Sequence, residues 1–323
     1  MKKLFAILLA AVVAVASIGT VLYFVLGGSN ITYVDTSGNT ADLFIDGDYI
    51  YVACGNTGKV DIFDISDPTS VGTPTTIILD DDADGVFVKD DYLYVACSDK
   101  GLAIIDVSDP TNPGTPVYIS TYSGYANDVN VVGNYAYISD EASNDGLHII
   151  DISNPASPTQ VATLGGFGLS YDIEISGDYA YLPSYQDGVY RVDISTPTSP
   201  SAPTQISTAK SQGLGISGTN LFIAEMWTSF QIVDITDPLS PGTPVTTSTA
   251  DAREVCIHGN YAYIAMDNDG VSVYDITNPA NPSRVKTFDT KGFCNDIKIS
   301  GSYAYLSCAH GNLGIIDITG IES

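Results

Sequence analysis

The residues best suited to chemistry in this 323-residue chain are carboxylates that recur at one fixed spacing. Carboxylates brought to one place repel one another unless a cation, a lysine or an arginine lies among them. Arg253 could serve as that positive charge. The alternative, which the sequence leaves open, is that each carboxylate only caps its own loop. Five of them lie seven residues before a Tyr-x-Tyr pair: Asp42, Asp128, Asp172, Glu254 and Asp296.

An acidic run at residues 80–85 matches half of a calcium-binding loop. In the sequence DDDADG, Asp80, Asp82, Asp84 and Gly85 follow the pattern D-x-D-x-D-G, and Asp91 falls at the twelfth place, where an EF-hand has a glutamate. Oxygen ligands at alternate positions suit Ca²⁺, which is the one cofactor that the sequence suggests. No flanking helices are predicted, and chance matches are common in a chain with 38 acidic residues.

The segment Glu225-Met226-Trp227 holds the only tryptophan of the chain. An exposed tryptophan beside a carboxylate can stack on a sugar or anchor a protein partner, so we count Glu225 and Trp227 among the ligand-binding candidates. The ring could equally fill space inside the fold, because a Tyr pair is missing nearby.

Cysteine and histidine add little. Cys294 and Cys308 are predicted to lie near each other on one hairpin, where they could form a disulfide outside the cytoplasm. The three histidines are spread over different parts of the chain, so no nucleophile–His–Asp set is evident.

The elements that must position these residues are seven copies of one unit. The stretch LHIIDISNPASP, from Leu147, returns as VDIFDISDPTS, LAIIDVSDPTNP and four further variants. The aspartate shared by all copies recurs every 41 to 45 residues, at positions 64, 106, 151, 193, 234, 275 and 317. Such a period indicates a repeat architecture.

Each unit reads as four short antiparallel strands. An alternating strand such as NDVNVV (127–132) turns at Gly133-Asn134 and returns as YAYIS (135–139). The repeated stretch is the third strand, prolines break it, and a Thr/Val-rich fourth strand follows, as in TPVYIST (115–121). Seven such units predict an all-β, seven-bladed β-propeller. The tyrosine pairs are expected to fill the space between blades, and the shared aspartate to accept backbone N–H groups in the proline turn.

The two ends of the repeat region support a closed ring. The last copy stops after its third strand, while ITYVDT (31–36) precedes the first unit unpaired. We therefore expect this N-terminal strand to complete the seventh blade, which removes an open edge. The recurring carboxylates then surround the mouth of the central channel, with Asp84 one place out of step and Gly213 in the fifth blade.

The motifs GNYAYI and GLHIIDISNPASP resemble the LVIVD repeat of bacterial and archaeal cell-surface proteins. The resemblance covers essentially all of the chain beyond the N-terminal segment and implies a propeller, but it implies no catalytic residues. The fifth copy departs from the pattern, because TNLFIAEMWTSF (219–230) lacks the tyrosine pair and the usual glycine.

The N-terminal segment is of a different kind. Lys2 and Lys3 precede 24 uncharged, mostly apolar residues, 4–27; as a helix these would rise about 36 Å, enough to cross a hydrocarbon core of about 30 Å. We predict a signal peptide or transmembrane anchor over residues 1–28 and the propeller over 29–323. The favoured reading is an uncleaved anchor helix, although Ala14-Val15-Ala16 offers a cleavage site that would give a secreted protein. Lysines stay on the cytoplasmic side, so the propeller should lie outside the cell, with its channel mouth facing away from the membrane.

Charge limits the partners. The formal net charge is −26, and the part beyond the two N-terminal lysines has 10 basic against 38 acidic residues. Such a field repels nucleic acid and anionic lipid, and we exclude DNA and RNA as partners. The function we expect is a binding module at the cell surface for a protein or a glycan. The alternative is a metal-dependent hydrolase or lyase that uses the channel carboxylates.

Overall fold

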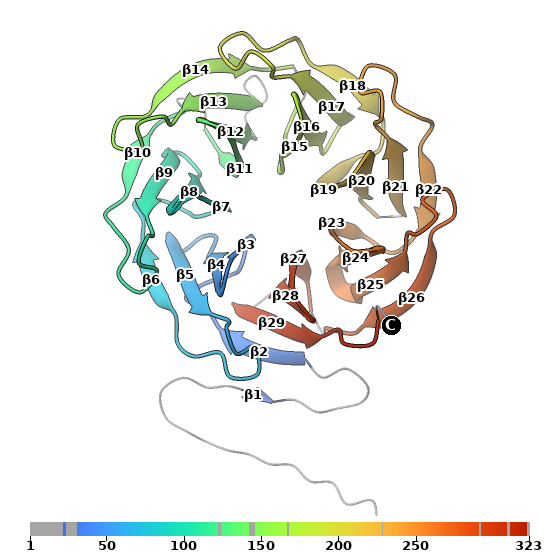
Figure 1. Cartoon of the computed structure of the whole chain (residues 1–323), viewed down its shortest axis with the longest axis horizontal. Coiled ribbons are helices and arrows are strands. Elements are labelled where there is room, and N and C mark those ends of the chain that lie inside the picture. Colours follow the sequence, from blue (N-terminus) through green and yellow to red (C-terminus); the bar gives the residue numbers. More distant parts are fainter. Residues whose placement is uncertain are drawn as a thin grey trace, which may run out of the picture.

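The computed structural model describes Leu22–Tyr23 and residues 31–321, except 122–123, 142–145, 167, 228, 291 and 309–310. These residues form seven antiparallel sheets arranged around a central axis (Figure 1). The prediction of an all-β, seven-bladed propeller is confirmed. A 3₁₀ turn, η1 (Asp267–Asp269), is the only helical element among the residues described.

Every blade has the same strand order. The first strands, nearest the axis, are β3 (Leu43–Asp46), β7 (Gly85–Lys89), β11 (Ala126–Val132), β15 (Glu174–Ser176), β19 (Ser211–Ser217), β23 (Ala252–His258) and β27 (Cys294–Ser300). The second strands are β4 (Tyr49–Ala53), β8 (Tyr92–Cys97), β12 (Tyr135–Asp140), β16 (Tyr179–Ser184), β20 (Asn220–Glu225), β24 (Tyr261–Met266) and β28 (Tyr303–Cys308). The third strands are β5 (Lys59–Asp64), β9 (Gly101–Asp106), β13 (Leu147–Asp151), β17 (Gly188–Asp193), β21 (Ser229–Asp234), β25 (Gly270–Asp275) and β29 (Asn312–Asp317). The outer strands of the first six blades are β6 (Thr75–Ile78), β10 (Val117–Ile119), β14 (Thr159–Leu164), β18 (Thr204–Ser207), β22 (Val245–Ser248) and β26 (Ser283–Phe288).

The seventh blade is completed from the other end of the chain, as predicted. Strand β2 (Ile31–Asp35) pairs with β29 over its whole length, from Ile31 opposite Ile316 to Asp35 opposite Asn312. A two-residue strand, β1 (Leu22–Tyr23), pairs with the outer side of β2. The ring therefore closes by hydrogen bonds between strands at opposite ends of the repeat region, since Ile31 pairs with Ile316 and Asp35 with Asn312.

The predicted N-terminal helix over residues 4–27 lies outside the described residues, apart from Leu22–Tyr23, which are strand rather than helix. Within the described part of the chain, no helix is long and apolar enough to cross a membrane.

The hairpins follow from the turn residues. In six blades a glycine with φ between +54° and +58° begins the two-residue turn between the first two strands, as at Gly47 and Gly133. The second blade uses Asp90 and Asp91 instead, with φ of 49° and 64°. Aspartate tolerates this left-handed conformation better than most residues other than glycine, so the hairpin forms there too.

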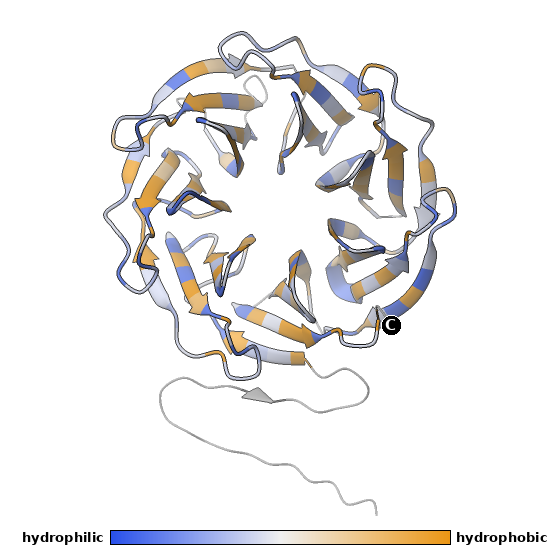
Figure 2. Cartoon of the chain, viewed as in Figure 1, coloured by the Kyte–Doolittle hydropathy of each residue, from blue (hydrophilic) through white to orange (hydrophobic). Residues whose placement is uncertain are grey.

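The hydrophobic core lies between blades. The second tyrosine of each Tyr-x-Tyr pair is at most 4 % exposed and packs with aliphatic side chains; Tyr51, for example, packs with Val88 and Leu93 of the next blade. In the fifth blade Phe222 takes this place, and it is 1 % exposed. Figure 2 shows the hydrophobic residues concentrated in the strands. The space-filling role predicted for the tyrosines is confirmed.

The shared aspartate ends the third strand in all seven blades. Its Oδ1 accepts the backbone N–H of the residue two positions later at 2.8–3.0 Å, as from Ser66 to Asp64. The hydroxyl and backbone bonds from that residue hold the pKa of the carboxyl below its usual value. The repeated stretch is thus a structural turn, on the face where the first hairpins also lie: Ile65 N, next to Asp64, donates to the hairpin carbonyl of Asp48.

Two glycines let neighbouring first strands approach each other closely at the axis. A Cβ on Gly85 would lie 2.6 Å from Asp128 Cα, and a Cβ on Gly213 would lie 2.4 Å from the carbonyl oxygen of Arg253. These contacts are to backbone atoms, which cannot swing aside.

Gly85→Ala should therefore destabilise the protein by about 1–3 kcal/mol, because the blades must separate to admit the methyl group. Gly72→Ala is the matched control, since a Cβ there meets nothing within 4 Å; its free energy of unfolding should change by less than about 0.5 kcal/mol. Urea unfolding of both variants measures the difference. Equal changes in the free energy of unfolding for the two variants would show that the first strands can accommodate a methyl group at the axis.

Candidate functional site

A cavity of about 420 Å³ opens at the channel and is lined by residues at and near the starts of the first strands. Each blade contributes one residue to its outer layer: Ala41, Asp84, Asn127, Tyr171, Gln212, Arg253 and Asn295. The next layer is the carboxylate ring, which we define as Asp42, Asp128, Asp172, Glu254 and Asp296. Deeper lie Phe44, Phe87, Asn130, Glu174 and Lys298.

The layering follows from strand geometry. Residues two apart on a strand share a face, so the deeper layer comes two residues after the ring. In four blades the pairing register shifts just before the ring position, for example between Ala126 and Asp128. A bulge of this kind sets two residues against one and re-aims side chains, and here it lets adjacent residues both line the cavity.

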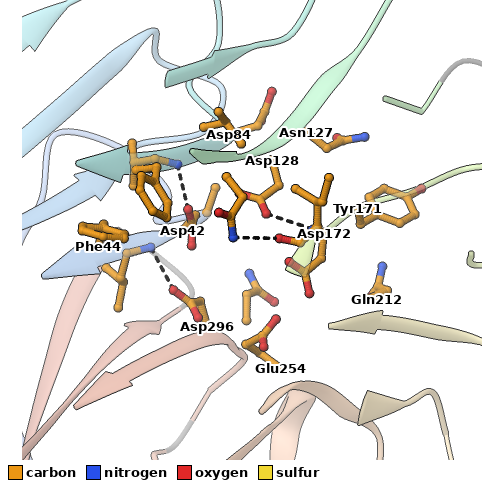
Figure 3. A pocket seen from close by; sticks show the side chains of 18 of the residues that line it. Asp42, Phe44, Asp84, Asn127, Asp128, Tyr171, Asp172, Gln212, Glu254 and Asp296 are labelled. Atoms are coloured by element: carbon orange, nitrogen blue, oxygen red, sulfur yellow. Dashed lines mark hydrogen bonds between the residues drawn. The ribbon is translucent and has the colours of Figure 1, made fainter. Parts of the chain in front are cut away.

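The ring carboxylates join neighbouring blades. Four aspartates each accept the backbone N–H that follows the ring position of the next blade. The bonds are Val86 N to Asp42 Oδ2 (2.7 Å), Ile173 N to Asp128 Oδ2 (3.1 Å), Leu214 N to Asp172 Oδ2 (2.6 Å) and Leu43 N to Asp296 Oδ2 (2.8 Å). Glu254 accepts a hydrogen bond from the backbone N–H of its neighbour Val255, as expected if each carboxylate caps its own loop. The four aspartates bond across to the next blade instead, so that alternative does not describe most of the ring. In Figure 3 the carboxyl groups surround one central space.

Confinement changes the protonation of these groups. Burial first, and then neighbouring negative charge, raises the pKa of Asp42, Asp128 and Glu254 well above the usual value. The same two causes raise the pKa of Glu174 to about 8. Burial raises the pKa of Asp84 to about 6, although the Ser98 hydroxyl bond opposes the shift. The channel thus holds carboxyl groups that retain protons at pH values where ordinary carboxylates have lost them.

The cation that lies against the ring is Lys298 rather than Arg253. Lys298 Nζ is 3.0 Å from Asp296 Oδ1. Burial lowers the pKa of this lysine, but the charges of Asp296, Asp42 and Glu254 outweigh burial and raise it. The side chain keeps 35 % of its surface open to the channel, so water there screens these charges.

Arg253 belongs to the mouth of the cavity. Its Nη1 donates to Gln212 Oε1 at 2.6 Å, and its Nη2 lies 3.2 Å from Asp251 Oδ2 and 3.5 Å from Asp267 Oδ1. Two carboxylates thus already neutralise this arginine.

An aromatic wall, which we define as Tyr171, Tyr185 and Trp227, runs outward from the cavity. The ring centroids are 6.1 Å apart for the two tyrosines and 6.2 Å apart for Tyr185 and Trp227, with edge-to-face packing. Trp227 is 56 % exposed, and its backbone N donates to Asp251 Oδ1. Phe222, not Trp227, fills the place of the missing tyrosine.

Glu225 does not accompany Trp227 to the surface. Its carboxylate accepts hydrogen bonds from the Ser229 hydroxyl and the Gln231 amide within its own blade. We therefore assign it to the internal packing of the fifth blade.

The predicted calcium residues are placed apart. Asp80, Asp82 and Asp84 precede β7, whereas Asp91 lies in the hairpin turn at the other end of that strand. Among the described residues, no group of three or more His, Cys, Asp or Glu side chains is arranged to hold a metal ion. Asp84 lines the channel cavity instead.

The structure does bring the predicted cysteine pair together. Cys294 and Cys308 face each other across β27 and β28, with their Sγ atoms 3.5 Å apart and both thiols free. Formation of a disulfide between them stays a prediction.

Comparison with known proteins agrees with the fold. A family model described as the LVIVD repeat matches residues 37–73, 80–118, 123–164, 168–208, 209–247, 250–290 and 291–321. The chain belongs to the LVIVD-repeat family. No curated protein matches this LVIVD-repeat chain significantly.

Solved structures resemble the LVIVD-repeat chain in shape. One is the computationally designed Ika8 protein, with a TM-score of 0.63 and 9 % identity over 88 % of this chain and 98 % of that one. Another is the WD40 beta propeller domain of Doa1, with a TM-score of 0.70 and 9 % identity over 87 % of this chain and 93 % of that one. At such low identity the likeness shows the fold alone.

Lys298, Glu174, Tyr171 and Tyr185 were missed by sequence reasoning. For Lys298 and Glu174 the signal was present, because each lies two residues after a ring position on the same strand. No sequence signal marks the two tyrosines, because the contacts of Tyr171 with Tyr185 and of Tyr185 with Trp227 arise only in the folded ring.

Removing the carboxylate of Asp296 should loosen the junction between the seventh and first blades. Asp296 is 4 % exposed, and Asp296→Ala leaves the buried Leu43 N–H and Lys298 without their closest acceptor. We expect a loss of about 3 kcal/mol in the free energy of unfolding. Asp296→Asn keeps an acceptor oxygen and should lose less than half as much. Equal losses in urea unfolding would contradict the role of the Leu43 bond.

The raised pKa of Glu174 makes stability depend on pH. Between its ordinary value of 4.5 and about 8, the folded state retains a proton that the unfolded chain releases, so stability is full below this window and falls as pH rises through it. Glu174→Gln removes the effect. Its thermal midpoint should exceed that of the wild type by about 2 °C or more at pH 9 and match it at pH 4. Parallel curves of midpoint against pH for the two proteins would contradict this assignment.

Proposed function

We propose that this chain is an extracytoplasmic binding module that engages a protein or a glycan with the face around the channel mouth. The observation that carries the proposal is the aromatic wall beside the cavity: Trp227 is 56 % exposed although tryptophan is costly to leave in water, and its neighbours lead directly to the cavity lining. Exposed aromatic anchors next to a pocket are typical of recognition surfaces.

The two faces of the ring differ in a way that supports this choice. The opposite face is built from turns that repeat in every blade, so its residues are accounted for by the fold. The mouth face is built from residues that differ from blade to blade, such as Asn127, Tyr171, Gln212 and Arg253. Variation around a constant frame is what a specific binding surface requires.

The proposed location rests on the N-terminal sequence. Residues 4–27 would anchor the chain in a membrane, or would be removed if the signal is cleaved, in which case the protein is secreted. The propeller would then stand outside the cell, and its net negative charge disfavours nucleic acid and anionic lipid as partners.

Among the described residues that line the channel, no group is arranged to hold a metal ion, so the structure does not favour a metal-dependent enzyme. Four of the five ring carboxylates each commit one oxygen to a backbone N–H group of the next blade, which holds them apart around the central space, and Asp296 also contacts Lys298. We therefore do not put forward a second function.

The test is binding by the purified full-length chain to arrays of immobilised oligosaccharides and peptides. The wild type should bind at least one probe class, and Trp227→Ala should weaken that binding tenfold or more, because the main exposed anchor is lost.

Leu239→Ala is the matched control, since Leu239 is 70 % exposed in a loop on the opposite face. It should leave binding unchanged. The proposal fails if no probe binds, or if Leu239→Ala abolishes binding while Trp227→Ala does not.

A further inference from the structure

The charge of the cavity restricts what it can take. Among the described residues, seven carboxyl groups line it and two basic residues oppose them. One of the two, Arg253, is already neutralised by Asp251 and Asp267. A ligand without positive charge leaves the carboxyl groups of the cavity either protonated or ionised beside one another, whereas a cationic ligand pairs with them in their ionised form.

The cavity is also wide enough for an organic group. About 420 Å³ falls within the range of small-molecule pockets and exceeds what one metal ion occupies. The ring aspartates each commit an oxygen to a backbone N–H, and their carboxyl groups still face the central space (Figure 3). Oxygens spread around such a space suit a group with several N–H donors.

The aromatic wall gives the cavity a direction. Tyr171 lines the cavity, Tyr185 packs against it, and Trp227 extends the surface outward to solvent. The wall is held in place: the Tyr171 hydroxyl donates to Glu141 Oε1, and the bond from Trp227 N to Asp251 continues through Arg253 to Gln212. A ligand that used the whole surface would have a cationic end in the cavity and a longer body lying on the rings.

We propose that the cavity receives the basic side chain of a partner protein, an arginine in preference to a lysine, whose flanking residues lie on Tyr171, Tyr185 and Trp227. A guanidinium group suits this site because it is planar, stacks on aromatic rings and forms paired hydrogen bonds with carboxylates. The inference rests on the proposed function and names the chemistry of its ligand.

Occupation by a cation has a second consequence. Burial and neighbouring negative charge raise the pKa of Asp42, Asp128 and Glu174, so these carboxyl groups hold protons more readily than exposed carboxylates when no cation is present. A bound guanidinium favours the ionised carboxylates, so binding should release protons to the solution.

The test uses the full-length chain and matched pentapeptides that differ only at the central residue of Ser-Gly-X-Gly-Ser, with blocked ends. Titration calorimetry should give the tightest binding for X = Arg, weaker binding for Lys, and at least tenfold weaker binding for citrulline, which has the shape of arginine without its charge. Titrations of the arginine peptide at pH 7 in two buffers of different ionisation enthalpy should show proton release.

Asp172→Asn and Glu254→Gln remove ring charge but keep acceptor oxygens, so they should fold like the wild type and bind the arginine peptide at least tenfold more weakly. Leu239→Ala should bind like the wild type. A thermal melt of each variant establishes that the chain is folded.

Three results would overturn the inference: equal binding of the arginine and citrulline peptides, unchanged binding by both ring variants, or free blocked arginine binding as tightly as the peptide, which would point to a small cation rather than a protein. If a neutral oligosaccharide binds and this binding requires Trp227, while the arginine peptide does not bind, the inference fails and the proposed function stands. If neither class binds through Trp227, the proposed function fails with it.

Discussion

The bond between a ring aspartate and the backbone N–H of the next blade is the interaction on which the structure most depends. First strands converge at the axis of a propeller, and their starts would face the channel with unpaired backbone groups unless an acceptor reached across. Asp42, Asp128, Asp172 and Asp296 supply that acceptor. The same bonds gather carboxyl groups around one space, so the solution to a folding problem also creates the acidic cavity.

The fold could be predicted almost entirely because its determinants repeat. Seven copies of one pattern, with Gly turns, Tyr pairs and a strand-ending aspartate, agree on the same blade, and the missing last strand identified β2 as the closing strand. When the local signals of every copy indicate the same structure, the fold of a repeat sequence can be predicted. The second blade shows the limit: Asp91 matches the calcium pattern, yet together with Asp90 it forms the hairpin turn that begins with glycine in the other blades.

The site could be predicted only in part, since its residues are those that do not repeat. The ring was found because its carboxylates keep a constant distance from the tyrosine pairs. The cation beside the ring, Lys298, could not be predicted from the sequence. A bulge turns both Arg253 and Glu254 toward the channel, and Arg253 is paired there with Asp251 and Asp267, which only the structure reveals. Contacts such as Tyr185 with Trp227 arise between blades and leave no trace in either local sequence.

The carboxyl groups of this acidic chain fall into two populations that differ in environment. Those that end the third strands are exposed and hydrogen-bonded, whereas those of the channel are confined beside one another. Side-chain ¹³C NMR of carboxyl groups across a pH titration tests this division most directly. We expect one set that titrates below the ordinary range and a second set that titrates well above it, with Glu174 near pH 8. A single set of ordinary pKa values would contradict it.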